Sequence, residues 1–179
     1  MTYKMVPVGK KVPEDIYVII EISSQSNPVK YECDKNIGLL FVDRFIPTPM
    51  FYPCNYGFIN QTISHDGDPL DSLVYSPYPI LPGTIIRCKP IGTLNMSDES
   101  GKDYKIISIP HSKICPEYSH INDIHHLPCI LKKQIIHFFE HYKDLENNKW
   151  VKIIGWENEI QAKKIISSAY KKFEKMKTI

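Results

Sequence analysis

The sequence predicts an α+β fold, a small closed or partly closed β-barrel with two helices packed outside it. Seven short segments rich in β-branched or aromatic residues, each bounded by Pro, Gly, Asn or Asp, are typical of strands. Most of them precede two segments with helical periodicity, an order that favours the α+β class. No repeat or linker divides the 179 residues, so we expect a single domain over residues 1–179.

The predicted strands are short enough for a small barrel. In chain order they cover residues 16–22, 29–33, 39–44, 73–75, 84–89, 104–109 and 150–154. Fourteen prolines, spread through the first three quarters of the chain, separate many of these segments. Proline suits such positions because it lacks the amide hydrogen that a strand ladder needs.

Two segments carry apolar residues at the spacing of one helix face. The first opens at Pro128, and its apolar face comprises Leu131, Ile135, Phe138, Phe139 and Tyr142. The face of the second comprises Ala162, Ile165, Ile166, Ala169 and Phe173. We predict that each helix packs this face against the strands.

The composition excludes several function classes. Apolar residues make up 42% of the chain and charged residues 23%, as in a globular protein with a real core. A net charge of +2 is too balanced to indicate a nucleic-acid or membrane partner. The sequence has no signal-peptide or membrane-spanning pattern, and its five scattered cysteines suit a reducing compartment, so we expect a cytoplasmic protein. The glycosylation patterns at Asn60 and Asn95 are then chance matches.

Residues 65–71 are the most informative segment, because the carboxylates of Asp66, Asp68 and Asp71 fall within six residues. At about 6 Å and an effective dielectric constant near 20, each like-charged pair costs on the order of 2 to 3 kcal/mol. Solvation in an acidic turn would offset this repulsion, and so would Mg²⁺, which prefers oxygen ligands. Asp98 and Asp103 lie in a second polar segment and join the cluster only if the barrel brings the two segments together.

Two familiar cation or phosphate sites are excluded. An EF-hand loop needs glycine at its sixth position and a closing glutamate, whereas Gly67 comes second after Asp66 and Pro77 takes the place of the glutamate. The sequence also lacks a G-x-x-x-x-G-K-[ST] loop, which excludes nucleotide hydrolysis by that route.

Ordered blocks along nearly the whole chain carry a family resemblance. The central block is Asp66-Gly67-Asp68-Pro69-Leu70-Asp71, and the others lie at residues 13–17, 30–32, 41–44, 51–57, 110–113, 137–145 and 149–151. In these blocks the chain resembles the soluble family I inorganic pyrophosphatases of the bacterial type. The resemblance implies a five-stranded OB-type barrel with additional strands, a homohexamer, and a hydrolase that uses several Mg²⁺ ions per site, with Mn²⁺ as a possible substitute. Its substrate would be pyrophosphate, split into two orthophosphates by in-line attack of a metal-activated water, with no covalent intermediate.

The resemblance also implies roles for individual residues. Asp66, Asp71 and Asp103 would bind the principal metal ions, and Asp98 would complete a further ion site. Asp68 would accept the proton of the attacking water. The substrate would be held by Lys30, Arg44, Tyr56, Lys105, Tyr142 and Lys143, and the cavity would also be lined by Glu21, Glu32 and Tyr52. The sequence departs from the family at Lys102, which stands before Asp103 where a neutral or acidic residue is more usual.

Taken alone, several of these residues have ordinary structural interpretations. Arg44 suits a surface salt bridge with Asp43 or Glu32. Tyr142 lies on the apolar face of its predicted helix, and Lys143 suits the solvated surface of the same helix.

Two other functions stay open at the level of sequence. His137, Glu140 and His141 match the H-x-x-E-H pattern of some zinc hydrolases. Because Asp144 extends the same stripe, the competing interpretation is a subunit contact whose histidines would make assembly pH-sensitive. An OB-type barrel with lysines and aromatic residues also suits single-stranded nucleic acid, although the near-neutral charge and the carboxylate cluster argue against this.

Overall fold

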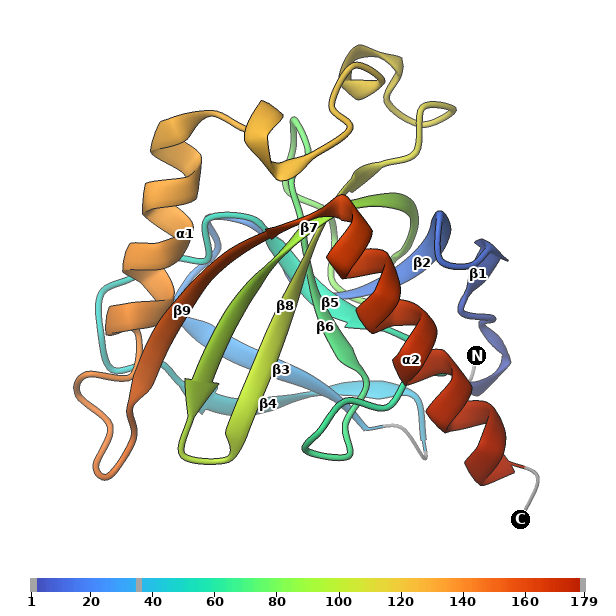
Figure 1. The fold of residues 1–179 in the computed structure, drawn as a ribbon. Coiled ribbons are helices and arrows are strands. Elements are labelled where there is room, and N and C mark those ends of the chain that lie inside the picture. Colours follow the sequence, from blue (N-terminus) through green and yellow to red (C-terminus); the bar gives the residue numbers. More distant parts are fainter. Residues whose placement is uncertain (1–2, 35–36, 178–179) are drawn as a thin grey trace.

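Five strands close into a barrel in the computed structural model, which describes residues 3–34 and 37–177 (Figure 1). Around the ring, each strand is hydrogen-bonded to the next: β2 (Asp15–Ile22), β5 (Asn55–Ile59), β6 (Leu70–Val74), β8 (Gly101–Pro110) and β7 (Ile85–Asp98). The ring closes because β7 also pairs with β2. The β6–β8 pair is parallel and the other four are antiparallel. The predicted five-stranded OB-type barrel is confirmed.

The described residues form four further strands, of which two extend this ring and two do not. The short β1 (Gly9–Lys11) pairs with β2, and β9 (Val151–Asn158) pairs with β7. The other two, β3 (Val29–Asp34) and β4 (Leu39–Phe45), form a separate antiparallel hairpin. In Figure 1 this hairpin passes behind the β7–β8 hairpin. It therefore provides a second wall opposite the barrel.

Both predicted helices are confirmed and lie outside the barrel (Figure 1). They are α1 (Cys129–His141) and α2 (Glu159–Lys177), and the described residues also form three short 3₁₀ helices at Tyr3–Met5, Pro116–Tyr118 and Ile124–His126. Asp123 links two of these elements, because one of its carboxylate oxygens accepts from the amide of His125 and the other from the amide of Glu159. The start of α2 is thus fixed to the segment that precedes α1.

The apolar faces of the two helices cover different parts of the barrel. The core under α1 contains Phe138 and Phe139 together with Leu94 of β7. The core under α2 contains Ile166 and Leu70. Each such side chain contributes roughly 1.5–3 kcal/mol when it is fully buried. This packing fixes the strand ends that carry the polar residues described below.

Sequence reasoning missed β1 and β5. The β5 strand contains Asn55 and Gly57, residue types that are rare in strands. Gly57 is required there, because a Cβ atom at this position would lie 1.9 Å from the carbonyl oxygen of Ile19 on β2. Other predicted strands were placed correctly but with wrong ends, since β6 begins three residues before Leu73, and β7 continues to Asp98.

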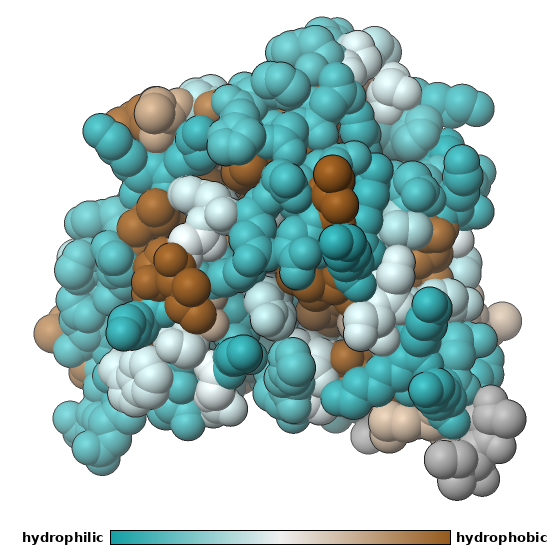
Figure 2. Space-filling model, in the orientation of Figure 1, coloured by the Kyte–Doolittle hydropathy of each residue, from teal (hydrophilic) through white to brown (hydrophobic). Residues whose placement is uncertain are grey.

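Hydrophilic side chains dominate the molecular face in Figure 2, and its apolar side chains form separate patches rather than one continuous surface. In the described part of the chain, no helix is long and apolar enough to cross a membrane.

Candidate active site

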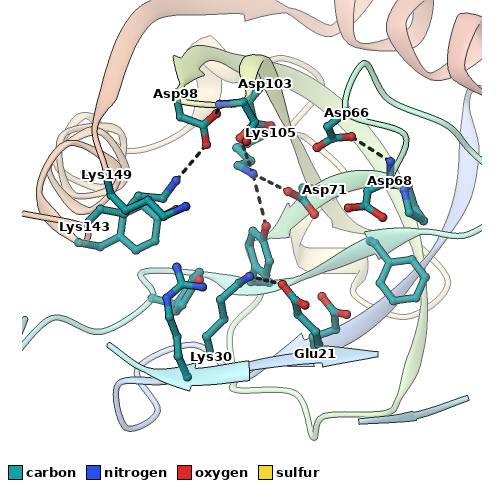
Figure 3. A pocket seen from close by; sticks show the side chains of 18 of the residues that line it. Glu21, Lys30, Asp66, Asp68, Asp71, Asp98, Asp103, Lys105, Lys143 and Lys149 are labelled. Carbon is teal, nitrogen blue, oxygen red and sulfur yellow. Dashed lines mark hydrogen bonds and ion pairs between the residues drawn. The ribbon is translucent and has the colours of Figure 1, made fainter. Parts of the chain in front are cut away.

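A polar cavity of about 290 Å³ lies between the barrel and the β3–β4 hairpin. Figure 3 shows carboxylates from the barrel along one side, and lysines from the segment after α1 and from β3 facing them. All the residues that the sequence analysis placed in a site line this one cavity: Glu21, Lys30, Glu32, Arg44, Tyr52, Tyr56, Asp66, Asp68, Asp71, Asp98, Asp103, Lys105, Tyr142 and Lys143. The fold therefore brings together residues that are up to 122 positions apart in the sequence.

The first group of carboxylates comes from the loop between β5 and β6 and from the start of β6. Asp66 and Asp68 stand on the loop, and Asp71 is the second residue of the strand. Gly67 has a φ of 93°, a conformation that favours glycine, and the amide of Asp68 donates to Asp66 Oδ1 at 2.9 Å. This local turn presents both loop carboxylates on the cavity side (Figure 3).

The second group comes from the β7–β8 hairpin. Asp98 ends β7, and Asp103 lies on β8 opposite Met96. The barrel brings this hairpin to the cavity that Asp66, Asp68 and Asp71 also line, as the cluster requires. Successive strand residues point to opposite faces, and Lys102 is accordingly exposed and is not among the residues that line the cavity. The departure from the family pattern therefore lies outside the site.

Lys105 sits between the two carboxylate groups. Its residue is only 5% exposed, and its Nζ contacts the carboxylates of Asp71 and Asp103, the latter at 2.8 Å. Burial alone would lower the pKa of Lys105, but the nearby negative charges, with Asp71 foremost, raise it well above its usual value. Burial raises the pKa of Asp103, and Lys105 opposes that shift. One buried cation is thus shared by two carboxylates.

The segment after α1 supplies cations at one end of the cavity. Lys143 is buried rather than solvated, and its Nζ lies 2.9 Å from Asp98 Oδ2 and 3.2 Å from Glu99 Oε1. Lys149 Nζ lies 2.7 Å from the same glutamate oxygen. Burial alone would raise the pKa of Glu99, but hydrogen bonds, the largest from Lys149, lower it to about 2.

Sequence reasoning assigned no role to Glu99 or Lys149, although both line the cavity. Each had a signal in the sequence, because Glu99 directly follows Asp98 and Lys149 opens the last of the matching blocks.

The ring of Tyr142 is held by core packing. It stacks on Phe138 with ring centroids 5.0 Å apart and an interplanar angle of 18°. Tyr142 nevertheless lines the cavity, so the core interpretation and the site interpretation both hold for this residue.

The β3–β4 hairpin places Lys30 and Arg44 opposite each other across its ladder. Lys30 contacts Glu32 and lies 3.2 Å from Asp43, and Arg44 Nη1 lies 2.5 Å from Asp43 Oδ2. The expected salt bridge of Arg44 is therefore present, on a side chain that also lines the cavity.

Glu21 is buried and lines the cavity. Its Oε1 accepts from the backbone amide of Cys33 at 2.8 Å. Burial, reinforced by the charges of Asp71 and Glu32, raises the pKa of Glu21 to about 8, so its carboxyl group is mostly protonated at neutral pH.

The charge and chemistry of the lining fit divalent cations. Eight carboxylates and five basic side chains line the cavity, a formal excess of three negative charges. Carboxylate oxygens are the ligands that Mg²⁺ and similar hard cations prefer. Within residues 3–34 and 37–177, however, no three His, Cys, Asp or Glu side chains stand close enough together to form a ready-made metal site. Lys105 and Lys143 instead pair with the carboxylates that would bind the ions.

Comparison with known proteins identifies the family. The family model described as inorganic pyrophosphatase matches residues 18–174. The chain belongs to the inorganic pyrophosphatase family. It is 74% identical over 175 residues to the inorganic pyrophosphatase of Buchnera aphidicola subsp. Baizongia pistaciae, an alignment that covers 98% of this chain and 100% of that protein. The Escherichia coli K12 inorganic pyrophosphatase is 58% identical over 172 residues, an alignment that covers 96% of this chain and 98% of that protein.

Solved inorganic pyrophosphatases have the same fold. The crystal structure of the Thermus thermophilus protein superposes with a TM-score of 0.92 at 40% identity, and the alignment covers 97% of this chain and 99% of that one. The Coxiella burnetii structure gives a TM-score of 0.91 at 47% identity, and the alignment covers 94% of this chain and 99% of that one. Membership of this pyrophosphatase family makes the chain a hydrolase and a metal-dependent enzyme.

The zinc-hydrolase alternative has no support from the arrangement of the α1 stripe. His137, Glu140 and His141 are not among the residues that line the cavity. His141 Nδ1 instead lies 2.8 Å from Asp144 Oδ2. The centroids of the His137 and His141 rings are 4.7 Å apart. Membership of the pyrophosphatase family likewise favours a hydrolase over the nucleic-acid-binding module.

Proposed function

We propose that the chain hydrolyses inorganic pyrophosphate to two orthophosphates in this cavity, with Mg²⁺ as its metal. The observation that carries the proposal is the meeting of aspartates with lysine and arginine side chains in one polar cavity. Pyrophosphate is a polyanion, so negative charge opposes attack by water and also accumulates on the leaving phosphate. Bound Mg²⁺ ions supply cationic charge for the phosphate oxygens and lower the pKa of coordinated water. Mn²⁺ is a possible substitute, because it accepts similar oxygen ligands.

In this proposal one group of side chains binds the metal ions and another binds the substrate. Asp66, Asp71 and Asp103 hold the principal ions, and Asp98 holds a further one. The substrate-binding groups are Lys30, Arg44, Tyr56, Lys105, Tyr142 and Lys143. Arg44 is suited to its role because a planar guanidinium can donate to two phosphate oxygens at once. Since Lys105 and Lys143 are paired with carboxylates, ion binding would release their ammonium groups for the substrate.

Asp68 is the proposed proton acceptor. It lines the cavity beside Asp66 and is exposed to solvent, so a water molecule can reach its carboxylate. Accepting the proton as the water attacks the phosphorus atom makes the nucleophile stronger, and the second phosphate then leaves directly. Glu21, Glu32 and Tyr52 complete the lining.

Phosphate release from pyrophosphate, measured with Mg²⁺ and with a chelator, tests the proposal. We expect activity with Mg²⁺ and its loss in the chelator. Asp68→Asn keeps the shape of the side chain but accepts a proton poorly, so turnover at neutral pH should fall by roughly 10²–10⁴-fold. Glu140→Gln on the exposed face of α1 is the control and should remain active. Full turnover of Asp68→Asn, or of Asp71→Ala, would contradict the assigned roles, and loss of activity in Glu140→Gln with assembly unchanged would revive the zinc alternative.

We also infer a homohexamer, assembled in part through the stripe His137, His141 and Asp144. The support is exposure, because the His141 and Asp144 side chains are 47% and 55% exposed beside their mutual contact. Sedimentation velocity of the unsubstituted chain and of His141→Ala is the test, and unchanged assembly of the variant would count against the inferred contact.

The proposed setting is the cytoplasm, with residues 1–179 forming a single pyrophosphatase domain. The five cysteines are scattered along the sequence with no paired spacing, which suits a reducing compartment. The family match over residues 18–174 and the packing of α2 against the barrel support a single domain. Limited proteolysis should therefore release no stable fragment, and a stable fragment would contradict this inference.

A further inference from the structure

The loop that carries Asp66 and Asp68 is closed at its base by a buried hydroxyl group. This loop, residues 60–69, joins the end of β5 to the start of β6, where Ile59 faces Leu70 across the ladder. Thr62 is only 2% exposed, and its Oγ1 donates to the Ile59 carbonyl oxygen at 2.6 Å and accepts from the Leu70 amide at 2.9 Å. One hydroxyl therefore serves both strand ends.

These contacts give the Asn60-Gln61-Thr62 pattern a structural meaning. The amide nitrogen of Asn60 donates to the backbone carbonyls of Tyr3 and Val6, both at 2.7 Å. Asn60 therefore holds the N-terminal segment while Thr62 holds the loop. Neither side chain lines the active-site cavity, so both act from behind it.

Helix α2 holds the same loop from outside. The amide of Ile63 donates to the Ala169 carbonyl oxygen at 3.1 Å, and Lys172 Nζ donates to the Ser64 carbonyl oxygen at 2.7 Å. Inside the loop, the Ser64 amide donates to the Asp68 carbonyl oxygen at 2.7 Å. A chain of hydrogen bonds thus runs from the Lys172 side chain of α2 through the backbone of Ser64 to the backbone of Asp68.

We propose that Thr62 is a positioning residue for the metal-binding and proton-accepting carboxylates, with Lys172 as a second support. Thr62 orients the Leu70 amide at the start of β6, one residue before Asp71, and closes the loop that holds Asp66 and Asp68. This inference rests on the proposed function of those carboxylates. The hydroxyl group of Thr62 is needed because it donates one hydrogen bond and accepts another. Valine has nearly the same shape as threonine but can do neither.

Thr62→Val and Thr62→Ser test the inference as a matched pair. Loss of the hydroxyl in Thr62→Val should lower kcat roughly 10- to 100-fold and raise the Mg²⁺ concentration at half-maximal activity, because small displacements of catalytic groups have effects of this size. Thr62→Ser retains the hydroxyl and should restore both values to within about threefold of the unsubstituted chain. In the metal-free protein, the Leu70 amide should exchange its hydrogen faster in Thr62→Val alone.

The assays are run well below the melting temperature of every variant, so that unfolding does not enter the rates. Faster exchange at Leu70 with unchanged kcat and Mg²⁺ dependence would mean a purely structural role and would overturn the proposal. If Thr62→Val does not fold, Lys172→Met decides, compared with Lys171→Met on the same exposed helix turn. Lys172→Met should need several-fold more Mg²⁺ than Lys171→Met, and equal behaviour of the two would overturn the proposal.

The active-site variants separate this inference from the proposed function. If Asp68→Asn and Asp71→Ala retain full turnover, the proposed roles of the carboxylates fail and Thr62 has nothing to position. If both lose turnover while Thr62→Val matches the unsubstituted chain, only the positioning role fails.

Discussion

Replacing Lys105 with methionine leaves two carboxylates without their shared counter-charge. Lys105 Nζ lies 2.8 Å from Asp103 Oδ2 and also contacts Asp71. At this separation and an effective dielectric constant near 20, one such pair is worth about 6 kcal/mol before the cost of burying the charges is subtracted. Removing one partner of a buried pair costs about 3–5 kcal/mol net, because the remaining charge stays buried and unpaired. We expect Lys105→Met to lose about 3–5 kcal/mol of unfolding free energy at neutral pH in chelator.

Urea unfolding with and without Mg²⁺ measures this effect. Lys102→Met is the matched control, because Lys102 lies on the same strand but is exposed, and its loss should change stability by less than about 0.5 kcal/mol. Mg²⁺ should reduce the difference in unfolding free energy between Lys105→Met and Lys102→Met, because bound cations replace the missing positive charge beside Asp71 and Asp103. The reasoning is refuted if Lys105→Met is within about 1 kcal/mol of the control in chelator, or if Mg²⁺ leaves this difference unchanged.

Three further variants test contacts that hold the fold together around the cavity. Asp123→Ala should cost about 1 kcal/mol by thermal or urea unfolding at pH 7, because it removes the acceptor for the Glu159 amide at the start of α2. Burial opposes the shift, but backbone hydrogen bonds lower the pKa of Asp123. The contribution of Asp123 to the unfolding free energy is therefore complete above the unfolded pKa and is lost as the pH falls through the lower folded pKa, so a cost of Asp123→Ala that does not shrink with falling pH would contradict this. Gly57→Ala should destabilise by about 3 kcal/mol or more, because its Cβ would lie 1.9 Å from the Ile19 carbonyl oxygen, and near-normal stability in urea would refute that steric argument. Phe138→Ala should cost about 3–5 kcal/mol and raise KM for pyrophosphate by loosening the adjacent tyrosine rings, whereas an unchanged KM would separate packing from binding.

The part of the fold that sequence patterns could predict is the part governed by local rules. Alternation and β-branched residues located most barrel strands, and the spacing of Phe138 and its neighbours located α1. The β5 strand escaped, because Gly57 is there to admit the backbone of β2, and that neighbour is 38 residues away along the chain. Closure through the β2–β7 pairing is likewise a long-range contact that no local pattern encodes.

The site could be predicted as a set of residues but not as an arrangement. Alone, Lys143 resembled a solvated helix residue, whereas it is buried and paired with Asp98, 45 positions away in the sequence. The pairing of Lys105 with Asp71 depends on the parallel β6–β8 register, in which these two residues are direct neighbours. Thr62 gave no chemical signal, because a hydroxyl acts there only through two backbone groups that the fold brings to it.

Charge balance in the cavity leads to one more prediction, about how many cations accompany the substrate. Eight carboxylates line the cavity, and Glu21, with a pKa of about 8, is mostly protonated at pH 7, which leaves an excess of two negative charges over the five basic side chains. One Mg²⁺ ion cancels that excess and leaves no positive charge for pyrophosphate. Binding of a non-hydrolysable diphosphate analogue should therefore draw in at least one additional Mg²⁺ ion per site, a stoichiometry that equilibrium dialysis with and without the analogue can measure. Tight analogue binding in chelator, or binding with no further Mg²⁺ uptake, would mean that the basic side chains neutralise the substrate by themselves.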